Sequence, residues 1–144
     1  MKIGIGLPAT TPGVRGELIL DWARKADAGP FSSVTILDRL VYPNFEALIT
    51  LAAVGAVTQR VRLMTSVLLA PLRNPAMLAK MAASIDALSN GRLTLGLGIG
   101  GRADDFEAAG VPMQRRGRIF EEELALMRRV WSGQPVSDTV GPIG

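Results

Sequence analysis

A short apolar segment followed by a helix-like segment is repeated four times along the chain, and this repetition constrains the fold more than any other feature. The apolar segments begin about every thirty residues, as expected for strands that alternate with helices. We predict strands at 2–7, 33–38, 61–69 and 93–99, and helices at 16–28, 45–59, 74–90 and 117–131. This alternation predicts an α/β protein whose strands are parallel and joined by right-handed crossovers.

Two architectures contain such a pattern: an open doubly wound sheet and a (β/α)8 barrel. A complete barrel needs about 250 residues. The 144 residues supply four of the eight strand–helix units and end in a Gly/Pro-rich tail at 134–144. We expect residues 1–144 to form a single domain, and the glycines of the fourth strand decide between the two architectures.

The fourth predicted strand contains a literal GxGxxG match at Gly96, Gly98 and Gly101. In a dinucleotide-binding turn such glycines follow the strand, where the backbone approaches the pyrophosphate. Here they alternate with large residues, and a period of two is typical of a strand that continues. We also expect no helix directly after Gly101, because the segment RADDFEAAGVP intervenes. The pattern therefore favours a barrel strand over a Rossmann turn.

Large residues on one face and glycines on the other suit the strands of a barrel. The large residues would pack against outer helices, and the small residues would thin the interior. We expect a packing role alone for Gly4, Gly6 and Gly96. We expect a ligand-facing role for the glycines nearest the carboxyl end of the fourth strand, which are Gly98, Gly100 and Gly101.

The composition excludes several kinds of chemistry. The chain has no histidine and no cysteine, which excludes a Ser-His-Asp triad, a thiolate nucleophile and the usual zinc sites. An enzyme with this composition is expected to use a bound cofactor for the difficult step. The arginines behind the net charge of +3 are scattered, so no nucleic-acid partner is expected. No signal peptide and no bilayer-spanning apolar run is recognised, and we therefore predict a cytoplasmic location.

Polar residues collect where the predicted strands end, which is where barrel enzymes place their active sites. Three arginines from three loops would converge there: Arg39, Arg73 and Arg102. Convergent arginines favour an anionic ligand, although exposed arginines are often only solvated. Asp38 is the carboxylate directly at a strand end, and it could instead pair with Arg39 or Arg73. For Asp104–Asp105 we expect a solvated turn and no metal site.

Three stretches resemble the luciferase-like monooxygenase superfamily, which contains flavin-dependent and coenzyme F-420-dependent oxidoreductases. They are VRLMTSVLLAPLRNPAMLAKMAASIDALSNGRLTLGLGIGGRADDFEAAGV, RRGRIFEEELALMRRVWSG and ILDRLVYPNFEAL. The resemblance extends from Lys2 to about Gly133. It implies a (β/α)8 TIM barrel, of which this chain supplies the N-terminal half, about the first four units. It also implies that FMN or coenzyme F-420 binds with its ring at the carboxyl-terminal mouth.

The resemblance also implies roles for particular residues. It implies a non-prolyl cis peptide bond at Ser66–Val67, pressed against the central ring of the cofactor. Asp38 matches an acidic residue that contacts the deazaflavin ring, and Gly98, Ile99 and Gly100 match a loop that borders the cofactor.

Two positions depart from some F-420-dependent dehydrogenases of this superfamily. Gly101 stands where those enzymes have a glutamate that acts as an acid, and Arg39 stands where they have a histidine. Proton-transfer roles therefore do not carry over, the catalytic residues stay unassigned, and a sugar-phosphate dehydrogenase is disfavoured.

The leading hypothesis is a flavin- or deazaflavin-dependent oxidoreductase or monooxygenase, or the N-terminal half of one. Its small-molecule substrate would lie over the ring, beside residues 8–12 and Arg102. The alternative is a non-catalytic half-barrel in which the first and fourth strands leave unpaired edges. Two copies could then close one barrel, so a homodimer is expected.

Overall fold

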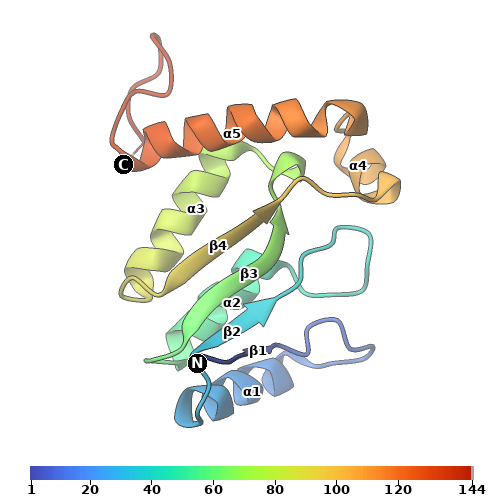
Figure 1. Cartoon of the computed structure of the whole chain (residues 1–144), viewed down its shortest axis with the longest axis vertical. Coiled ribbons are helices and arrows are strands. Elements are labelled where there is room, and N and C mark those ends of the chain that lie inside the picture. Colours follow the sequence, from blue (N-terminus) through green and yellow to red (C-terminus); the bar gives the residue numbers. More distant parts are fainter. Residues whose placement is uncertain (144) are drawn as a thin grey trace.

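The computed structural model describes residues 1–143 and contains a four-stranded sheet in which every pair of strands is parallel (Figure 1). The strands are β1 (Gly4–Gly6), β2 (Ser33–Ile36), β3 (Arg62–Leu69) and β4 (Leu93–Gly98), in the spatial order β1-β2-β3-β4. A Rossmann-type doubly wound sheet places its first strand beside its fourth. The sequential order excludes that arrangement and is the order of an arc of a barrel.

Five α-helices and two short 3₁₀ helices connect and flank these strands in the described part of the chain. They are α1 (Gly16–Ala28), α2 (Ala47–Val57), η1 (Ala70–Leu72), α3 (Pro75–Leu88), α4 (Ala103–Ala109), η2 (Met113–Arg115) and α5 (Arg116–Trp131). Helix α1 packs against α2, α2 against α3, and α3 against α5. The strands and the four longer helices therefore follow the predicted order, with ends that differ by a few residues.

Helix α4 corrects the prediction that no helix follows Gly101. The acidic residues Asp104 and Asp105 occupy its first turn, where they complement the helix dipole. Gly110 ends it in the left-handed conformation, with φ of 67°. Seven residues are too few to show a helical period in an apolar pattern, so the segment was expected to be a loop.

Side chains cap the amino ends of α2 and α3. Glu46 caps α2, two residues after Asn44, a residue type that also favours this position, and its carboxylate accepts the N–H of Ile49 at 2.7 Å. Asn74 caps α3, and its side-chain oxygen accepts the N–H of Met77 at 3.0 Å.

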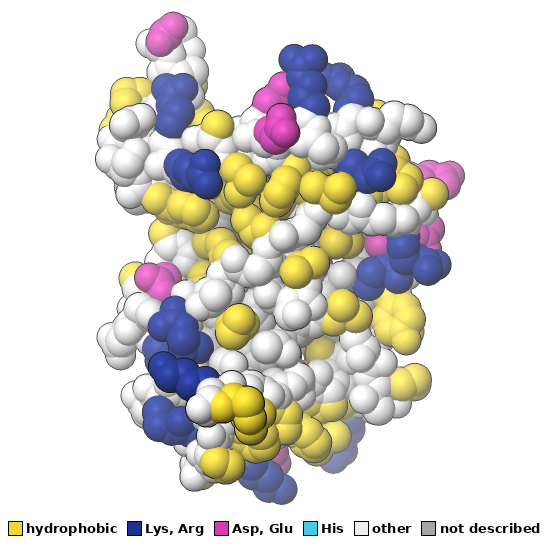
Figure 2. Space-filling model, in the orientation of Figure 1, with side chains coloured by type: hydrophobic (Ala, Val, Ile, Leu, Met, Phe, Trp, Pro, Cys, Tyr) yellow, Lys and Arg dark blue, Asp and Glu magenta, His cyan; other side chains and the backbone are white. Residues whose placement is uncertain are grey.

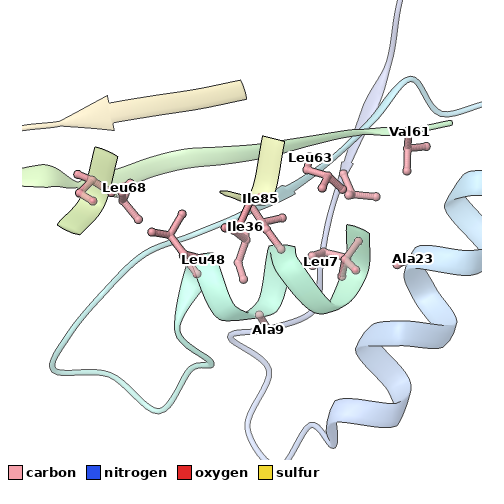
Figure 3. Close-up of a cluster of buried hydrophobic side chains, with 14 of the residues drawn as sticks. Leu7, Ala9, Ala23, Ile36, Leu48, Val61, Leu63, Leu68 and Ile85 are labelled. Carbon is pink, nitrogen blue, oxygen red and sulfur yellow. The ribbon is translucent and has the colours of Figure 1, made fainter. Parts of the chain in front are cut away.

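The two faces of the sheet differ in what covers them. One row across the sheet packs into the core between sheet and helices: Ile5, Val34, Leu63 and Leu93. The adjacent row is not fully buried: Gly6, Thr35, Met64 and Thr94. Figure 3 shows side chains of β2 and β3 meeting Leu48 of α2. The predicted division between large residues toward the helices and small residues toward the other face holds for β1 and β4, whereas β3 places the large side chain of Met64 on the other face.

The amino ends of the strands are tied together by two arginines that bind backbone carbonyls. Arg60 donates to the carbonyls of residues 26, 27, 29 and 31 at 2.7–3.2 Å. Arg92 is buried and makes five hydrogen bonds, four of them to the carbonyls of residues 55, 58, 61 and 89. The Asp27 carboxylate accepts the N–H groups of residues 59, 60 and 61. These contacts fix each connecting loop to the next one along the chain.

Helix α1 buries one stripe of its surface. Ile19, Ala23 and Ala26 are buried, whereas Leu18 and Trp22 remain partly exposed. In residues 1–143 no helix has the length and apolar composition to cross a bilayer.

Candidate functional site

The carboxyl half of β3 departs from regular strand pairing. The peptide bond between Ser66 and Val67 is cis, as the family resemblance implied, and the register with β4 shifts between Thr65 and Leu68. Thr65 bridges the two strands at this point, because its hydroxyl donates to the Gly96 carbonyl at 2.8 Å and accepts the Gly96 N–H at 3.0 Å. The N–H and the carbonyl of Gly96 are thus both satisfied by the Thr65 hydroxyl.

The glycines of β4 make room for this irregular segment. A Cβ on Gly96 would overlap the carbonyl oxygen of Thr65, which agrees with the expected packing role. A Cβ on Gly98 would lie 2.7 Å from Cγ2 of Val67. The side chain of Val67 therefore fills the space that Gly98 leaves open. Ser66 and Val67 are exposed, and 41% of the Val67 surface is accessible.

The residues that follow β4 continue the same surface. Ile99 is exposed. Gly100 has φ of 75°, and a Cβ on this residue would lie 2.9 Å from the ring of Phe106. Gly100 is required by its left-handed conformation and by this close approach. Gly101 has open space where a side chain would be.

Asp38 lies buried at the end of β2, and both of its oxygens are engaged. Arg73 donates to them from its two terminal nitrogens at 2.7 and 2.8 Å, and the N–H of Leu69 donates at 2.8 Å. Arg73 also reaches Glu46 at 3.0 Å. Burial opposes the charge of Arg73, but its bonds to Asp38 and Glu46 hold its pKa above the ordinary value. The cluster fixes the loop after β2 to the loop after β3.

Arg39 is tied to the residues that open α4. Its Nε donates to Asp105 at 2.6 Å, and a terminal nitrogen lies 3.3 Å from Asp104. Asp105 is 1% exposed and also accepts the N–H groups of Leu40 and Val41. Burial alone would raise the pKa of Asp105, but the N–H of Val41 and the Arg39 guanidinium hold it below the ordinary value. The loops after β2 and β4 are thus joined.

The three arginines expected to bind an anion do not meet at one point. Arg73 belongs to the Asp38 cluster, and Arg39 belongs to the Asp105 cluster. Arg102 is largely exposed and lies 3.5 Å from Asp104. Each guanidinium therefore has a carboxylate partner within the chain.

Two acidic residues were not singled out by the sequence. Asp105 was expected in a solvated turn, yet it is the buried anchor of the loop after β2. Glu123 on α5 is buried, and its Oε2 has no hydrogen-bond partner. Its burial raises its pKa to about 7. The sequence feature that could have identified Glu123 as buried is its spacing from Phe120 and Met127, which places it on the apolar face of α5. Among residues 1–143 there is no group of three or more acidic side chains placed to hold a metal ion.

Comparison with protein families identifies one match over residues 1–143, to the family described as luciferase-like monooxygenase. An uncharacterized protein of Mycobacterium tuberculosis is 34% identical over 133 residues, covering 77% of this chain and 46% of that protein. An F420-dependent glucose-6-phosphate dehydrogenase of Intrasporangium calvum is 35% identical over 150 residues, covering 95% of this chain and 44% of the enzyme. The chain thus spans less than half the length of these relatives.

Solved structures share the fold. The monooxygenase RslO1 from Streptomyces bottropensis superimposes with a TM-score of 0.82 and 28% identity, covering 99% of this chain and 48% of that enzyme. The oxygenating constituent of 3,6-diketocamphane monooxygenase from Pseudomonas putida, in complex with FMN, superimposes with a TM-score of 0.83 at 24% identity. The match covers 94% of this chain and 40% of that protein. These neighbours are TIM-barrel enzymes, so the predicted fold class, the first four units of a (β/α)8 barrel, is confirmed.

Proposed function

The chain belongs to the luciferase-like monooxygenase family, and from this premise we propose that it forms the ring-binding half of a barrel oxidoreductase whose cofactor is FMN or coenzyme F-420. Support comes from its relatives, which include enzymes named as F420-dependent and a structure of the same fold in complex with FMN. We propose residues 1–144 as one domain, the N-terminal half of that barrel, with 134–144 as a tail.

One observation carries the proposal: an exposed aliphatic side chain, Val67, is held over Gly98 at the carboxyl ends of β3 and β4. A planar aromatic ring packs well on such a surface, because the neighbouring polar groups are already paired. Thr65 is bonded to Gly96, and Asp38 is bonded to Arg73. The residues present therefore fit a flavin or deazaflavin ring.

The phosphate-bearing part of the cofactor has weaker support in this chain. Phosphate groups are usually held by unpaired arginines, lysines or helix N-termini. Arg39 and Arg73 are both in ion pairs. We propose that this part of the cofactor is held outside residues 1–143.

When bound, the ring supplies hydride transfer or oxygen activation, which no side chain of this composition provides. The side chains of this protein would position the ring. Val67 would support one face of the ring, and Ser66, Ile99 and Gly100 would border it. Asp38 acts on the site through Arg73 and the Leu69 N–H, since both of its oxygens are engaged. A substrate would approach from the other face of the ring.

Titration of the whole chain with FMN and with coenzyme F-420, followed by fluorescence, tests the proposal. We expect binding of one of them, weakened about tenfold or more by V67D, because a carboxylate would be desolvated against the ring. The matched control is I49D on α2, which also changes an exposed aliphatic side chain. Equal loss in both variants, or no binding by the parent chain, contradicts the proposal.

A second candidate is supported by the two ends of the sheet. In the described residues β1 pairs only with β2, and β4 pairs only with β3. Unpaired edges attract other strands, so a homodimer without catalytic activity is the alternative function. Sedimentation of the chain with and without each cofactor distinguishes the oxidoreductase from the homodimer, because the alternative requires a dimer that binds neither cofactor. A cytoplasmic location stays a prediction.

A further inference from the structure

Each end of the sheet has an apolar pocket on the side that the helices cover. The β4 pocket, about 490 Å³, lies between α3, β4 and α5, and the residues that line it include Ala82, Asp86, Leu93, Leu95 and Trp131. The β1 pocket, about 190 Å³, lies between α1 and β1 and is lined by Ile5, Trp22, Lys25, Ala26 and Phe31.

Both pockets lie beside a strand edge that is unpaired in residues 1–143, since β1 and β4 are the two ends of the sheet. Trp22 and Trp131 are exposed, and Leu93 and Leu95 are only partly buried. Figure 2 shows a row of apolar side chains just below the charged side chains at the top of the molecule, where Figure 1 places α5 above β4. Apolar side chains next to an unpaired strand edge form a surface on which another strand can dock.

The two pockets lie at the same level of the sheet. Ile5 in the β1 pocket and Leu93 in the β4 pocket belong to the same row of residues across the four strands. If β1 of a second copy pairs in parallel with β4, Ile5 of the second copy continues this row beyond Leu93. The β1 pocket of the second copy then faces the β4 pocket, and both sets of apolar side chains leave water.

The charges of the two pockets are opposite. Asp86 is the one charged residue that lines the β4 pocket, and Lys25 is the one that lines the β1 pocket. One oxygen of Asp86 accepts the N–H of Leu93 at 3.0 Å. Within residues 1–143 neither Asp86 nor Lys25 forms an ion pair. A charge that is withdrawn from water at an interface is stabilised by an opposite charge on the partner.

We propose that two copies of this chain close one eight-stranded barrel, in which β4 of each copy pairs in parallel with β1 of the other and Asp86 of each lies opposite Lys25 of the other. Each copy supplies four of the eight strands, so the same head-to-tail contact forms twice and closes the ring. The loop after β1 of the second copy then lies beside Gly98 and Ile99, and the mouth is completed by both copies. This pairing does not depend on which cofactor is bound, and it goes beyond the homodimer named above by assigning its contacts.

The first test reverses the two charges and measures the dissociation constant of the dimer by sedimentation. K25D and D86K should each raise this constant about tenfold or more, because each variant places like charges opposite one another at both contacts. An equimolar mixture of the two variants should form dimers again, since both contacts of the mixed dimer join opposite charges. The control is R24D, which changes the adjacent basic side chain of α1, a residue that pairs with Asp21 within the chain.

The second test uses tryptophan fluorescence of the whole chain. Trp22 and Trp131 are its two tryptophans, and one lines each pocket. Their emission should move to shorter wavelength as the protein concentration rises, because both rings leave water when the pockets meet. In K25D this change should need an about tenfold higher concentration. Thermal melting of each variant separates loss of the contact from loss of the fold.

The outcomes distinguish this pairing from the proposed function. A parent chain that stays monomeric overturns the pairing, as do dimers that tolerate both charge reversals or that weaken equally in R24D. Oligomers that grow beyond two copies also overturn it, because the ring is then not closed. Dimers that respond to the charge reversals but bind neither FMN nor coenzyme F-420 support the pairing and contradict the proposed oxidoreductase. A monomer that binds FMN does the reverse.

Discussion

The two ends of the sheet use arginine in different ways. At the amino ends, Arg60 and Arg92 donate to backbone carbonyls of successive loops and leave no nitrogen directed to a ligand. At the carboxyl ends, Arg39 and Arg73 pair with carboxylates on neighbouring loops and leave apolar side chains at the surface. The first arrangement closes the structure, and the second shapes an open surface. We therefore expect stability to depend most on the amino ends, and we propose that the carboxyl ends recognise the cofactor.

The largest expected effect lies at the amino ends. R92A should lower the free energy of unfolding by about 3–4 kcal/mol, because several buried carbonyls lose their donor at once. Chemical denaturation measures this loss. The control R62A removes an exposed arginine that bonds to Thr94 and the Leu93 carbonyl, and should cost less than about 1 kcal/mol. Similar losses in the two variants would mean that burial of Arg92 is not the cause.

A somewhat smaller loss is expected at the carboxyl ends. D38A removes the two oxygens that accept hydrogen bonds from the terminal nitrogens of Arg73, one of which also accepts the Leu69 N–H. The free energy of unfolding should fall by about 2–3 kcal/mol, because the charge of Arg73 is left partly buried. E46Q removes the charge of the more exposed partner of Arg73 and leaves one oxygen for two contacts, the ion pair and the cap of α2, so it should cost about 1 kcal/mol. A greater effect of E46Q than of D38A would contradict this ranking.

Glu123 differs from the carboxylates at the carboxyl ends of the sheet, because it is a buried carboxyl group with an unpaired oxygen. Burial raises its pKa to about 7 from the ordinary 4.5, so the folded chain favours the protonated form. The contribution of Glu123 to the free energy of unfolding is highest below pH 4.5, falls between pH 4.5 and 7, and stays low above pH 7. E123Q should remove this slope and stabilise the chain at pH 8 by about 2 kcal/mol.

Denaturation at pH 5 and pH 8 measures the effect of Glu123. The control E122Q changes the adjacent exposed glutamate, which pairs with Arg118, and should leave the slope in place. An unchanged pH dependence in E123Q would show that another group causes it.

The smallest effect is expected for D104N, which changes an exposed carboxylate at the opening of α4. Asp104 lies 3.3 Å from Arg39 and 3.5 Å from Arg102. Exposed ion pairs contribute little, so the free energy of unfolding should change by less than about 0.5 kcal/mol. A thermal melt compared with that of D105N checks the difference between the two adjacent aspartates.

The sequence predicts the fold well because the fold depends on local periods. Alternation of period two in β4 is visible within a few residues. The glycine match was interpreted correctly because its neighbours Leu95 and Leu97 share the opposite face. Helix α4 was missed because it is too short to show a period.

The site is harder to predict, because its contacts join residues far apart in the chain. Asp105 and Arg39 are 66 positions apart, and Arg73 and Asp38 are 35 apart. The sequence indicates which loops carry arginines, but it does not show whether a guanidinium faces a ligand or a neighbouring carboxylate. For Asp38 a pair with Arg39 or Arg73 was left open, and the structure selects Arg73. The roles of Ser66, Val67, Gly98, Ile99 and Gly100 toward a cofactor stay predictions.

The guanidinium groups of Arg60 and Arg92 have a consequence for engineering. Since these groups join neighbouring loops at the amino ends of the strands, the loops at the carboxyl ends can be exchanged without breaking their hydrogen bonds. A library that randomises positions 40–45 while retaining Arg39 and Asp105 should therefore yield mostly folded members. The chain offers a scaffold in which new recognition surfaces can be selected with little loss of foldability.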